Sequence, residues 1–401
     1  MPLPKSVALL SAGYPPIMAG GIDVQTYDLA HALSSLNVNV TVLCGGSRTP
    51  KRIQENPTLT ILRLPMANVP PRVVGFQLQN IAIFKRILPK YDIIHSQHSS
   101  GSIYGFLKES IRKPWVVSFH DHQLTRLKML FEVKPWQLSV GDLAYYTVGY
   151  SIFEVLTRIE LKWADHYIAC GMTGFQDYLR FNKIDPAKTT LIRNGIDLEK
   201  INLILDQAKQ KEDSENKSYK IFTCGRLYAS KGTEYLIRAM PKVLKTHRNV
   251  VLNIFGKGPL HTYFENLISS LKLREHVRLE GHVPYDALVR EMNDSDIAVF
   301  PSLIEVGASL AVMEAMACRR AVIAFDYPFS NEIIKHGENG YLVPPKNFDA
   351  LSNAINLLLS DAKLRRRLGE NAYQNIVENH DTKNVVKKYL KVYSQLLSIC
   401  N

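Results

Sequence analysis

The sequence predicts an α/β protein of two doubly wound parallel-sheet domains, and three observations support this fold class. The chain has 401 residues, which is more than one ordinary hydrophobic core accommodates. Short apolar runs rich in β-branched residues alternate with helical patterns in both halves, as in parallel sheets covered by helices on both faces. A polar, highly charged stretch separates the halves, and it has little to bury.

The first half contains seven strand-like runs. The first run, SVALLSA, leads through a glycine-containing loop to the helical pattern DVQTYDLAHALSSL. The predicted strands of this series lie at 6–12, 38–46, 59–65, 92–97, 115–121, 166–171 and 189–195. We therefore predict a first domain at residues 1–197 and a charged linker at 198–217.

The second half repeats the alternation and adds a terminal helix. Its predicted strands lie at 220–227, 249–258, 277–284, 296–302, 320–326 and 340–345. They predict a second domain at residues 218–381. The final stretch, 382–401, has helical periodicity, with an apolar stripe formed by Val385, Tyr389, Val392, Leu396 and Leu397.

Composition limits the partners and the compartment. The net charge of +12 and the pI near 9.3 indicate anionic partners such as phosphates, nucleic acid or an anionic membrane face. Five scattered cysteines without CxxC spacing argue against a zinc ribbon or a disulfide framework and favour a reducing cytoplasm. The first apolar run is too short for a signal peptide, and no window has the length of a membrane span. We expect a protein in the cytoplasm or on a membrane surface.

Glycines and cations follow predicted strands, which is where open parallel sheets bind ligands. Gly20 and Gly21 precede the first helix, so the backbone there can approach a phosphate closely, although a double glycine is also an ordinary turn. Arg226 and Lys231 flank the corresponding turn of the second series. Two cations beside a helix start suit a diphosphate, and the alternative is a pair of solvated side chains.

Further motifs follow in the second half. Gly256 and Gly258, in FGKGP, open another strand-to-helix turn, which by itself is a common loop. Glu305 and Glu314 surround a small-residue turn that opens an apolar helix, and HGENGYLVPP comes after them. Each motif is weak alone, whereas their order along the chain is specific.

In this order the motifs resemble the retaining nucleotide-sugar glycosyltransferases of family four. The series includes the glycine loop, a strand ending in His120-Asp121, NGID at 194–197, GRL followed by KG, GxGP, the paired glutamates and GENGYLV. The resemblance covers nearly the whole chain and implies the GT-B fold. In that fold two Rossmann-like domains face each other across a cleft, the first binding the acceptor and the second the nucleotide-sugar, and the C-terminal helix returns to the N-terminal domain.

The resemblance also implies roles for individual residues. Arg226 and Lys231 would hold the donor diphosphate and offset charge on the leaving nucleotide, which agrees with the reasoning from residue type. Glu314 would bond the ribose hydroxyls, while Glu305 and His120 would lie near the sugar. The implied catalytic residues are His120, Arg226, Lys231 and Glu305. The implied donor-binding residues are Gly20, Gly21, Arg226, Lys231, Gly256, Gly258, Ser309, Leu310 and Glu314.

The spacing of the two glutamates departs from the family. The common pattern has seven residues between them, whereas this chain has eight, VGASLAVM. The phase of LAVMEAMA looks normal, so we place the additional residue in the EVGAS turn, where a loop can absorb it. Glu314 therefore matches the family position more securely than Glu305 does. The alternative for Glu305 is that the additional residue displaces it, so that it is only an acid in a loop or a charge at a helix start.

The resemblance implies a metal-independent, retaining transfer of a hexose-type sugar from a UDP- or GDP-sugar to a glycan or a lipid-linked acceptor, with no cofactor. The acceptor would attack the face from which the nucleotide leaves, and the departing phosphate would help to deprotonate it. The two glutamates are then no hydrolase acid/base pair. Histidines in HSQH (95–98) and HDH (120–122) are compatible with metal ligation, but strand-end histidines also suit a sugar cleft and no cysteine pairing supports zinc.

The acceptor side is less defined. Residues 124–162 are rich in aromatic side chains and include Arg126, Lys128 and Lys134. Such a segment suits an anionic membrane on the inner face of the cell and a lipid-linked acceptor, and equally suits ordinary core-facing helices.

Three other classes remain open from the sequence. A nucleotide-sugar epimerase or hydrolase of the same fold would turn over donor without an acceptor product. A non-catalytic scaffold would bind donor and transfer nothing. Nucleic-acid binding is disfavoured, because the basic residues are dispersed rather than gathered in a recognisable motif.

Overall fold

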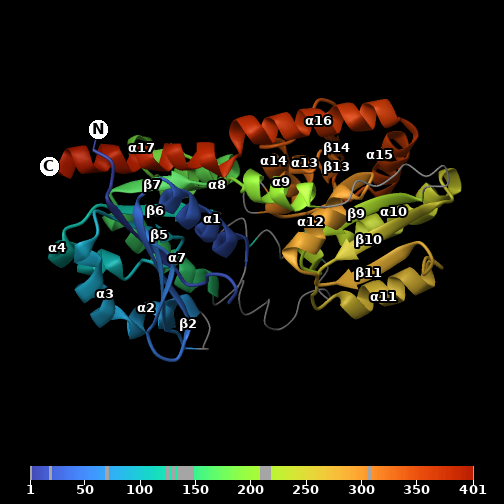
Figure 1. The fold of residues 1–401 in the computed structure, drawn as a ribbon. Helices are drawn as coiled ribbons and strands as arrows, with labels where there is room; N and C mark the ends of the chain where they lie inside the picture. The colour runs from blue at the N-terminus through green and yellow to red at the C-terminus, as the bar shows by residue number, and fades with distance from the viewer. Residues whose placement is uncertain are drawn as a thin grey trace. The chain divides into compact units, whose positions relative to one another are not determined.

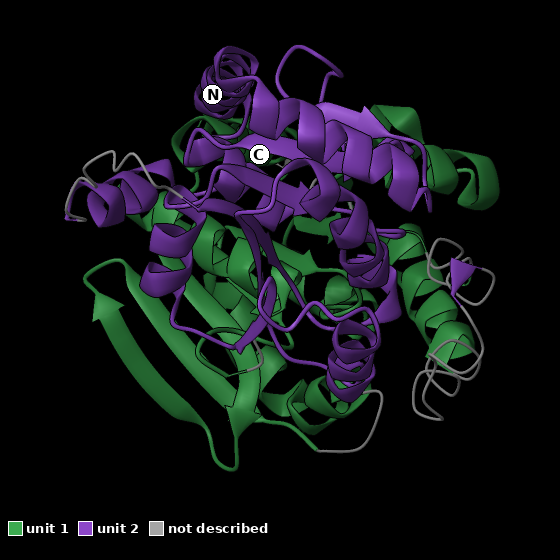
Figure 2. Ribbon diagram, turned by 90° about the vertical axis from the view of Figure 1, so that its right-hand side faces the viewer, with its two compact units in different colours: residues 1–127, 140–195, 382–401 green, residues 128–139, 196–381 purple. Residues whose placement is uncertain are grey.

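The structure, a computed structural model, describes residues 2–17, 20–67, 72–120, 122, 127, 132–133, 149–207, 218–305 and 309–400. The chain forms two compact units, which Figure 2 distinguishes by colour. Unit 1 consists of residues 1–127, 140–195 and 382–401, and unit 2 consists of residues 128–139 and 196–381. Each unit contains one sheet (Figure 1).

The sheet of unit 1 has eight strands in the order β3-β4-β2-β1-β5-β6-β7-β8. They are β1 (Ser6–Ser11), β2 (Asn39–Ser47), β3 (Lys51–Asn56), β4 (Leu59–Pro65), β5 (Ile93–Gln97), β6 (Trp115–Phe119), β7 (His166–Ala169) and β8 (Thr189–Leu191). All pairs are parallel except β3 with β4. β1 lies between β2 and β5, so the strand order reverses at its carboxyl end, where doubly wound sheets bind ligands.

Helices cover both faces of this sheet. They are α1 (Gly21–Ser35), α2 (Arg72–Gln79), α3 (Ile81–Ile87), α4 (Tyr104–Ile111), α7 (Tyr150–Trp163), α8 (Met172–Asp177) and α17 (Thr382–Cys400). One apolar cluster joins β1, β2 and β5 to α1 and α17, and a second joins the other face to α2, α3 and α4. The alternation of side chains along each strand supplies both clusters, since Val7 and Leu9 belong to the first and Ala8 and Leu10 to the second.

The C-terminal helix packs in unit 1, as the resemblance implies. Val385, Tyr389, Val392 and Leu396 of the predicted stripe are buried in the cluster beneath α17, and Leu397 packs against it. The prediction that the last helix returns to the N-terminal sheet is therefore confirmed.

The sheet of unit 2 has six parallel strands in the order β11-β10-β9-β12-β13-β14. They are β9 (Tyr219–Cys224), β10 (Val250–Phe255), β11 (Val277–Gly281), β12 (Ile297–Phe300), β13 (Ala321–Phe325) and β14 (Tyr341–Val343). The order reverses between β9 and β12, so the loops after these strands meet at the second switch point.

Helices also cover both faces of the second sheet. They are α9 (Leu198–Asp206), α10 (Thr233–Thr246), α11 (His261–Ser270), α12 (Tyr285–Asn293), α13 (Leu310–Ala317), α14 (Pro328–Asn331), α15 (Phe348–Ser360) and α16 (Ala362–Asn379). One face packs against α10, α11 and α15, and the other against α9, α12, α13 and α16.

The predicted linker contains a buried helix. α9 buries Leu198, Ile201 and Ile204 in the core of unit 2, because these apolar residues recur at helical spacing. The expectation that this stretch has little to bury is wrong for Leu198–Asp206. Residues 208–217 lie outside the described residues, and the predicted domain boundaries stay a prediction.

The aromatic, basic segment at 124–162 is described only in part. Arg126, Lys128 and Lys134 lie outside the described residues, whereas α7 buries Thr157 and Glu160. Val133 packs into the core of unit 2, and Glu132 Oε2 lies 2.6 Å from Lys346 Nζ. Among the described helices, none combines the length and apolarity that crossing a membrane requires.

Candidate active site

The loop after β9 carries the two predicted cations. β9 ends at Cys224, and a short 3-10 helix, η6 (Ala229–Lys231), leads to Gly232 and α10. Gly232 has a φ of 64°, a left-handed conformation that glycine adopts without a steric penalty. Arg226 and Lys231 therefore both lie in the turn between a central strand and a helix start, as predicted. The Arg226 guanidinium lies over the Tyr228 ring, 5.2 Å from its centroid.

Three glycines allow the neighbouring loops to pack backbone against backbone. A Cβ at Gly232 would lie 1.8 Å from Pro301 O, and one at Gly256 would lie 1.9 Å from Gly225 O. At Gly258 it would lie 2.5 Å from Leu227 O. The GxGP motif and the glycine of KG thus serve the close contact of three strand-end loops. Their direct contact with a ligand stays a prediction.

An ion pair joins two of the predicted residues across this junction. Lys231 Nζ lies 2.5 Å from Glu305 Oε1, and Ser302 Oγ donates to the same oxygen at 2.7 Å. Both charged side chains are largely buried, with 24% of Lys231 and 14% of Glu305 exposed. The chain thus holds Glu305 against Lys231 despite the additional residue in the following turn, part of which, 306–308, lies outside the described residues.

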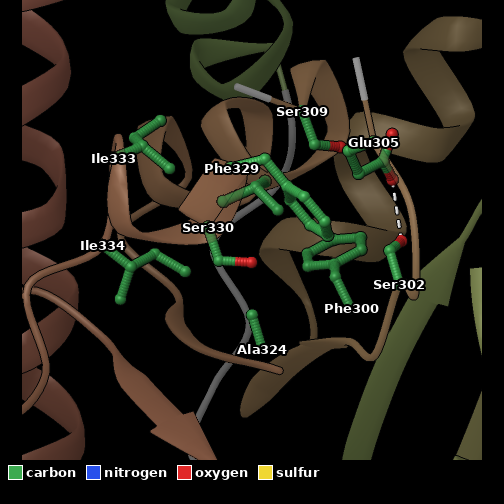
Figure 3. Close-up of a pocket in the computed structure, with 10 residues that line it drawn as sticks. Phe300, Ser302, Glu305, Ser309, Ala324, Phe329, Ser330, Ile333 and Ile334 are labelled. Atoms are coloured by element: carbon green, nitrogen blue, oxygen red, sulfur yellow. Dashed lines mark hydrogen bonds between the residues drawn. The ribbon is translucent and has the colours of Figure 1, made fainter. Parts of the chain in front are cut away.

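Glu305 also lines a pocket at the end of β12 (Figure 3). The pocket contains about 260 Å³ of empty space, including its open mouth. Glu305, Ser302 and Ser309 supply its polar rim, and Phe300 and Phe329 lie beside each other in its wall. With Ser330, the pocket presents one carboxylate and three hydroxyls beside apolar walls, groups of the kind that recognise polar ligands.

Glu314 is a third charged residue near the carboxyl end of β9. It lies on α13, whose first residue is Leu310 and whose N-cap is Ser309. Burial raises the pKa of the Cys224 thiol at the end of β9, and the charge of Glu314 raises it further. Lys231 lowers that pKa and Glu305 raises it. Glu314, Lys231 and Glu305 therefore all lie close enough to the carboxyl end of β9 for their charges to affect Cys224.

The strand ends of unit 1 hold the remaining predicted residues. His120 follows β6 directly, is buried, and its Nε2 lies 2.8 Å from Gln97 Oε1. His122 Nε2 lies 2.6 Å from Asn182 Oδ1, while His95 lies between the Tyr393 hydroxyl and Ser118 Oγ. Within the described ranges no group of three or more His, Cys, Asp or Glu side chains is placed to hold a metal ion.

An aspartate organises the glycine loop before α1. Gly20 N donates to Asp23 Oδ2 at 2.8 Å, and a Cβ at Gly13 would lie 2.4 Å from Asp23 Oδ1. Burial raises the pKa of Asp23 to about 6, although the hydrogen bond from Gly20 lowers it. The Gly20-Gly21 pair is thus held by a carboxylate of its own helix, and its role toward a phosphate stays a prediction.

Sequence reasoning missed three residues of these sites: Ser302, Gln97 and Asp23. The PS dipeptide at the end of β12 was visible, but serine after a strand is too common to indicate a role. Gln97 lies within the HSQH run, where the histidines are the residues typical of metal or sugar sites and the glutamine indicates no role. Asp23 stands three residues after Gly20, the spacing of a helix-capping carboxylate, which was a usable signal.

Comparison with known proteins agrees with this architecture. A family model described as glycosyltransferase family 4 matches residues 19–200, and one described as glycosyl transferases group 1 matches residues 206–375. An uncharacterized glycosyltransferase of Methanocaldococcus jannaschii is 29% identical over 403 residues, covering 96% of this chain and 97% of the relative.

Two solved structures share the fold over nearly the full length. Sucrose-phosphate synthase from Thermosynechococcus elongatus superposes with a TM-score of 0.80 at 22% identity, covering 98% of this chain and 100% of that one. HepE of Anabaena, solved in complex with UDP and glucose, superposes with a TM-score of 0.71 at 19% identity, covering 98% of this chain and 99% of that one.

The two Rossmann-like sheets give the chain the GT-B fold that these structures share. The two family models and the M. jannaschii relative identify it as a glycosyltransferase. Within that class, the first half of the chain matches the model of glycosyltransferase family 4 and the second half matches the model of glycosyl transferases group 1.

Proposed function

We propose that this glycosyltransferase moves a hexose-type sugar from a UDP- or GDP-sugar to a glycan or lipid-linked acceptor, with retention at the anomeric carbon and without a metal. The observation that carries the proposal is the cluster of Lys231, Glu305 and Ser302 at the second switch point. It combines a cation for a diphosphate with an acceptor of hydrogen bonds for sugar hydroxyls.

The cations would act on the leaving group. Negative charge accumulates on the nucleoside diphosphate as the bond to the sugar breaks, and fixed cations stabilise that charge without rearranging. Lys231 directly precedes Gly232, the N-cap of α10, where the helix dipole also favours anions, and Arg226 lies in the same loop. Two protein cations would thereby do the work that a metal ion does elsewhere.

The carboxylates would bind rather than react. Glu305 already accepts hydrogen bonds from Lys231 and Ser302, which suits a residue that grips sugar hydroxyls and not a general acid. Glu314 would bond the ribose, and Ser309, Leu310, Gly256 and Gly258 would shape the donor loop. His120 would lie near the sugar. A same-face reaction needs no carboxylate nucleophile.

Support for the donor class comes from the HepE structure, whose ligands are UDP and glucose. A glycan or a lipid-linked acceptor agrees with the net charge of +12, since such acceptors often carry phosphates or lie on an anionic membrane. We place the enzyme in the cytoplasm, with contact to the inner face of the cell membrane as an additional proposal.

The test is binding of UDP, GDP, ADP and their sugars to wild type, Arg226→Ala and Lys242→Ala, measured by calorimetry. Lys242 is the control, because it is a cation on α10 that pairs with Asp349 at the surface. One nucleotide class should bind wild type and the control alike, and Arg226→Ala should weaken it about tenfold or more. Equal loss in the control, or no binding of any nucleotide, would contradict the donor site.

Product analysis then tests the reaction. The donor that binds is incubated with candidate acceptors, and the anomeric configuration of the product is read by NMR. Retention and unchanged rates in EDTA are expected. Donor turnover without acceptor product would instead indicate an epimerase or a hydrolase, and binding without turnover would indicate a scaffold.

A further inference from the structure

Gln97 and His120 end two neighbouring strands of unit 1. β5 and β6 are parallel, and Gln97 is in register with Ser118, two residues before His120. Gln97 is 2% exposed and His120 is 4% exposed, so water does not compete strongly for their contact. The distance from His120 Nε2 to Gln97 Oε1 is 2.8 Å, that of a good hydrogen bond.

The chemistry of the pair determines the position of the proton. A carboxamide oxygen only accepts hydrogen bonds, so the proton between Oε1 and the ring must belong to His120 Nε2. In the neutral imidazole the lone pair is then on Nδ1. Gln97 thereby distinguishes between two tautomers that are otherwise close in energy, and it also fixes the rotation of the ring.

The surrounding residues hold Gln97 and His120 in place. His95 and Ser118 precede them by two positions on their strands and hence lie on the same face of the sheet. His95 Nε2 lies 2.8 Å from Ser118 Oγ, and its Nδ1 lies 2.6 Å from the Tyr393 hydroxyl on α17. Burial lowers the pKa of His95 to about 3, and the charge of His120 lowers it further, so His95 is a neutral support.

We infer that Gln97 is a positioning residue for His120, holding its ring in the Nε2–H tautomer with the lone pair on Nδ1. The HSQH run thus supplies a support for a histidine on the next strand and not a metal site. The consequence for catalysis rests on the proposed function, in which His120 lies near the sugar, whereas the tautomer itself does not.

The experiment is NMR of protein labelled with ¹⁵N-histidine, comparing wild type, Gln97→Met and Gln97→Glu. His120 is assigned with a His120→Asn variant, and His122 is the internal control, because its Nε2 also meets an amide oxygen, that of Asn182. Wild type and Gln97→Glu should show the Nε2–H tautomer of His120. Gln97→Met, of similar length but without the acceptor, should shift it toward Nδ1–H while the His122 signals stay unchanged.

Two NMR results would overturn the inference: an Nδ1–H tautomer in wild type, or an unchanged Nε2–H tautomer in Gln97→Met.

The kinetic readout is separate. With a donor from the binding panel, Gln97→Met should lower kcat about tenfold while the donor KM stays within about twofold, and Gln97→Glu should recover part of the loss. If wild type transfers no sugar, the proposed function fails and the NMR result still decides the role of Gln97.

Discussion

At the scale of single residues, Lys231 is shared between two anions. Its Nζ contacts Glu305, and in the proposed function it must also hold a diphosphate. Glu305→Gln would remove the competing charge and retain an oxygen that accepts from Ser302. We expect this variant to bind UDP several-fold more tightly and to transfer sugar at least about a hundredfold more slowly, because the sugar loses a charged acceptor. Calorimetry with UDP and a transfer assay measure the two effects, and weaker UDP binding would contradict the shared role.

Glu160 makes stability depend on pH. It is completely buried on α7, accepts hydrogen bonds from Ser99 N and Ser102 Oγ, and burial raises its pKa to about 8 from the ordinary 4.5. Between these values the folded protein keeps a proton that the unfolded chain has lost. Stability should therefore be fully present below pH 4.5 and decline as the pH rises through this window.

Glu160→Gln should remove this decline, since glutamine has no proton to lose. We expect the thermal midpoint of the variant to rise relative to wild type as the pH goes from 5 to 8, measured by circular dichroism. Glu154→Gln on the same helix, where Glu154 pairs with Arg158, is the control and should follow wild type. Parallel profiles for Glu160→Gln and wild type would show that this carboxyl ionises with little cost.

The sequence predicts a site most directly where residue type alone suggests a partner. Arg226 and Lys231 before a helix indicate an anion site, whereas the sugar and ribose roles of Glu305 and Glu314 come from the resemblance, and these roles stay predictions. The ion pair itself joins residues 74 positions apart, a contact that only the strand order creates. Gln97 was missed for the same reason, because its significance depends on the strand beside it.

At the scale of elements, the loop before α10 depends on a glycine contact. Gly232→Ala and Gly281→Ala both place alanine at positive φ, but only the first meets an atom, Pro301 O at 1.8 Å, while nothing lies within 4 Å of the second. We expect a loss of about 1 kcal/mol for Gly281→Ala and about 3 kcal/mol or more for Gly232→Ala, measured by urea unfolding. Equal losses would show that backbone strain alone matters at these positions.

The packing of α17 on unit 1 allows a second test. Val386 is 1% exposed, and the next residue, Lys387, is exposed. Val386→Asp should destabilise unit 1 by about 3 kcal/mol or more, since it buries a charge without a counter-ion. Lys387→Asp, its control, should change the unfolding free energy by about 0.5 kcal/mol or less. A small effect of Val386→Asp would mean that the helix contributes little to the core beneath it.

The elements themselves were predictable where burial is continuous. β12 is apolar throughout, and β1 is apolar between its two terminal serines, because helices cover both faces of these sheets. β3 escaped prediction because KRIQEN has a single apolar residue and pairs only at the edge of the sheet. α9 escaped because its apolar residues were interpreted together with the highly charged chain that follows Asp206.

At the scale of the whole molecule, the division into two units separates the proposed roles. Arg226, Lys231, Glu305 and Glu314 all belong to unit 2, and His120 belongs to unit 1. The sequence order of the motifs allowed this division to be predicted, since each half repeats the strand-and-helix alternation. It did not reveal that residues 128–139 belong to unit 2, because that depends on the burial of Val133 and the pairing of Glu132.

This division predicts where a nucleotide without sugar stabilises the protein. UDP should bind loops of unit 2 alone, so hydrogen exchange should slow at residues 225–232 and 301–305. A ligand at a hundred times its Kd stabilises the state it binds by about 2.7 kcal/mol, which bounds the protection expected there. The strand ends at 95–97 and 118–120 should exchange as in the free protein, since neither Gln97 nor His120 belongs to the donor unit. Lys231→Met should abolish the protection and Lys242→Met should retain it. Slowed exchange at 118–120 with UDP alone would mean that the nucleotide acts on both units, and the assignment of separate roles would have to be abandoned.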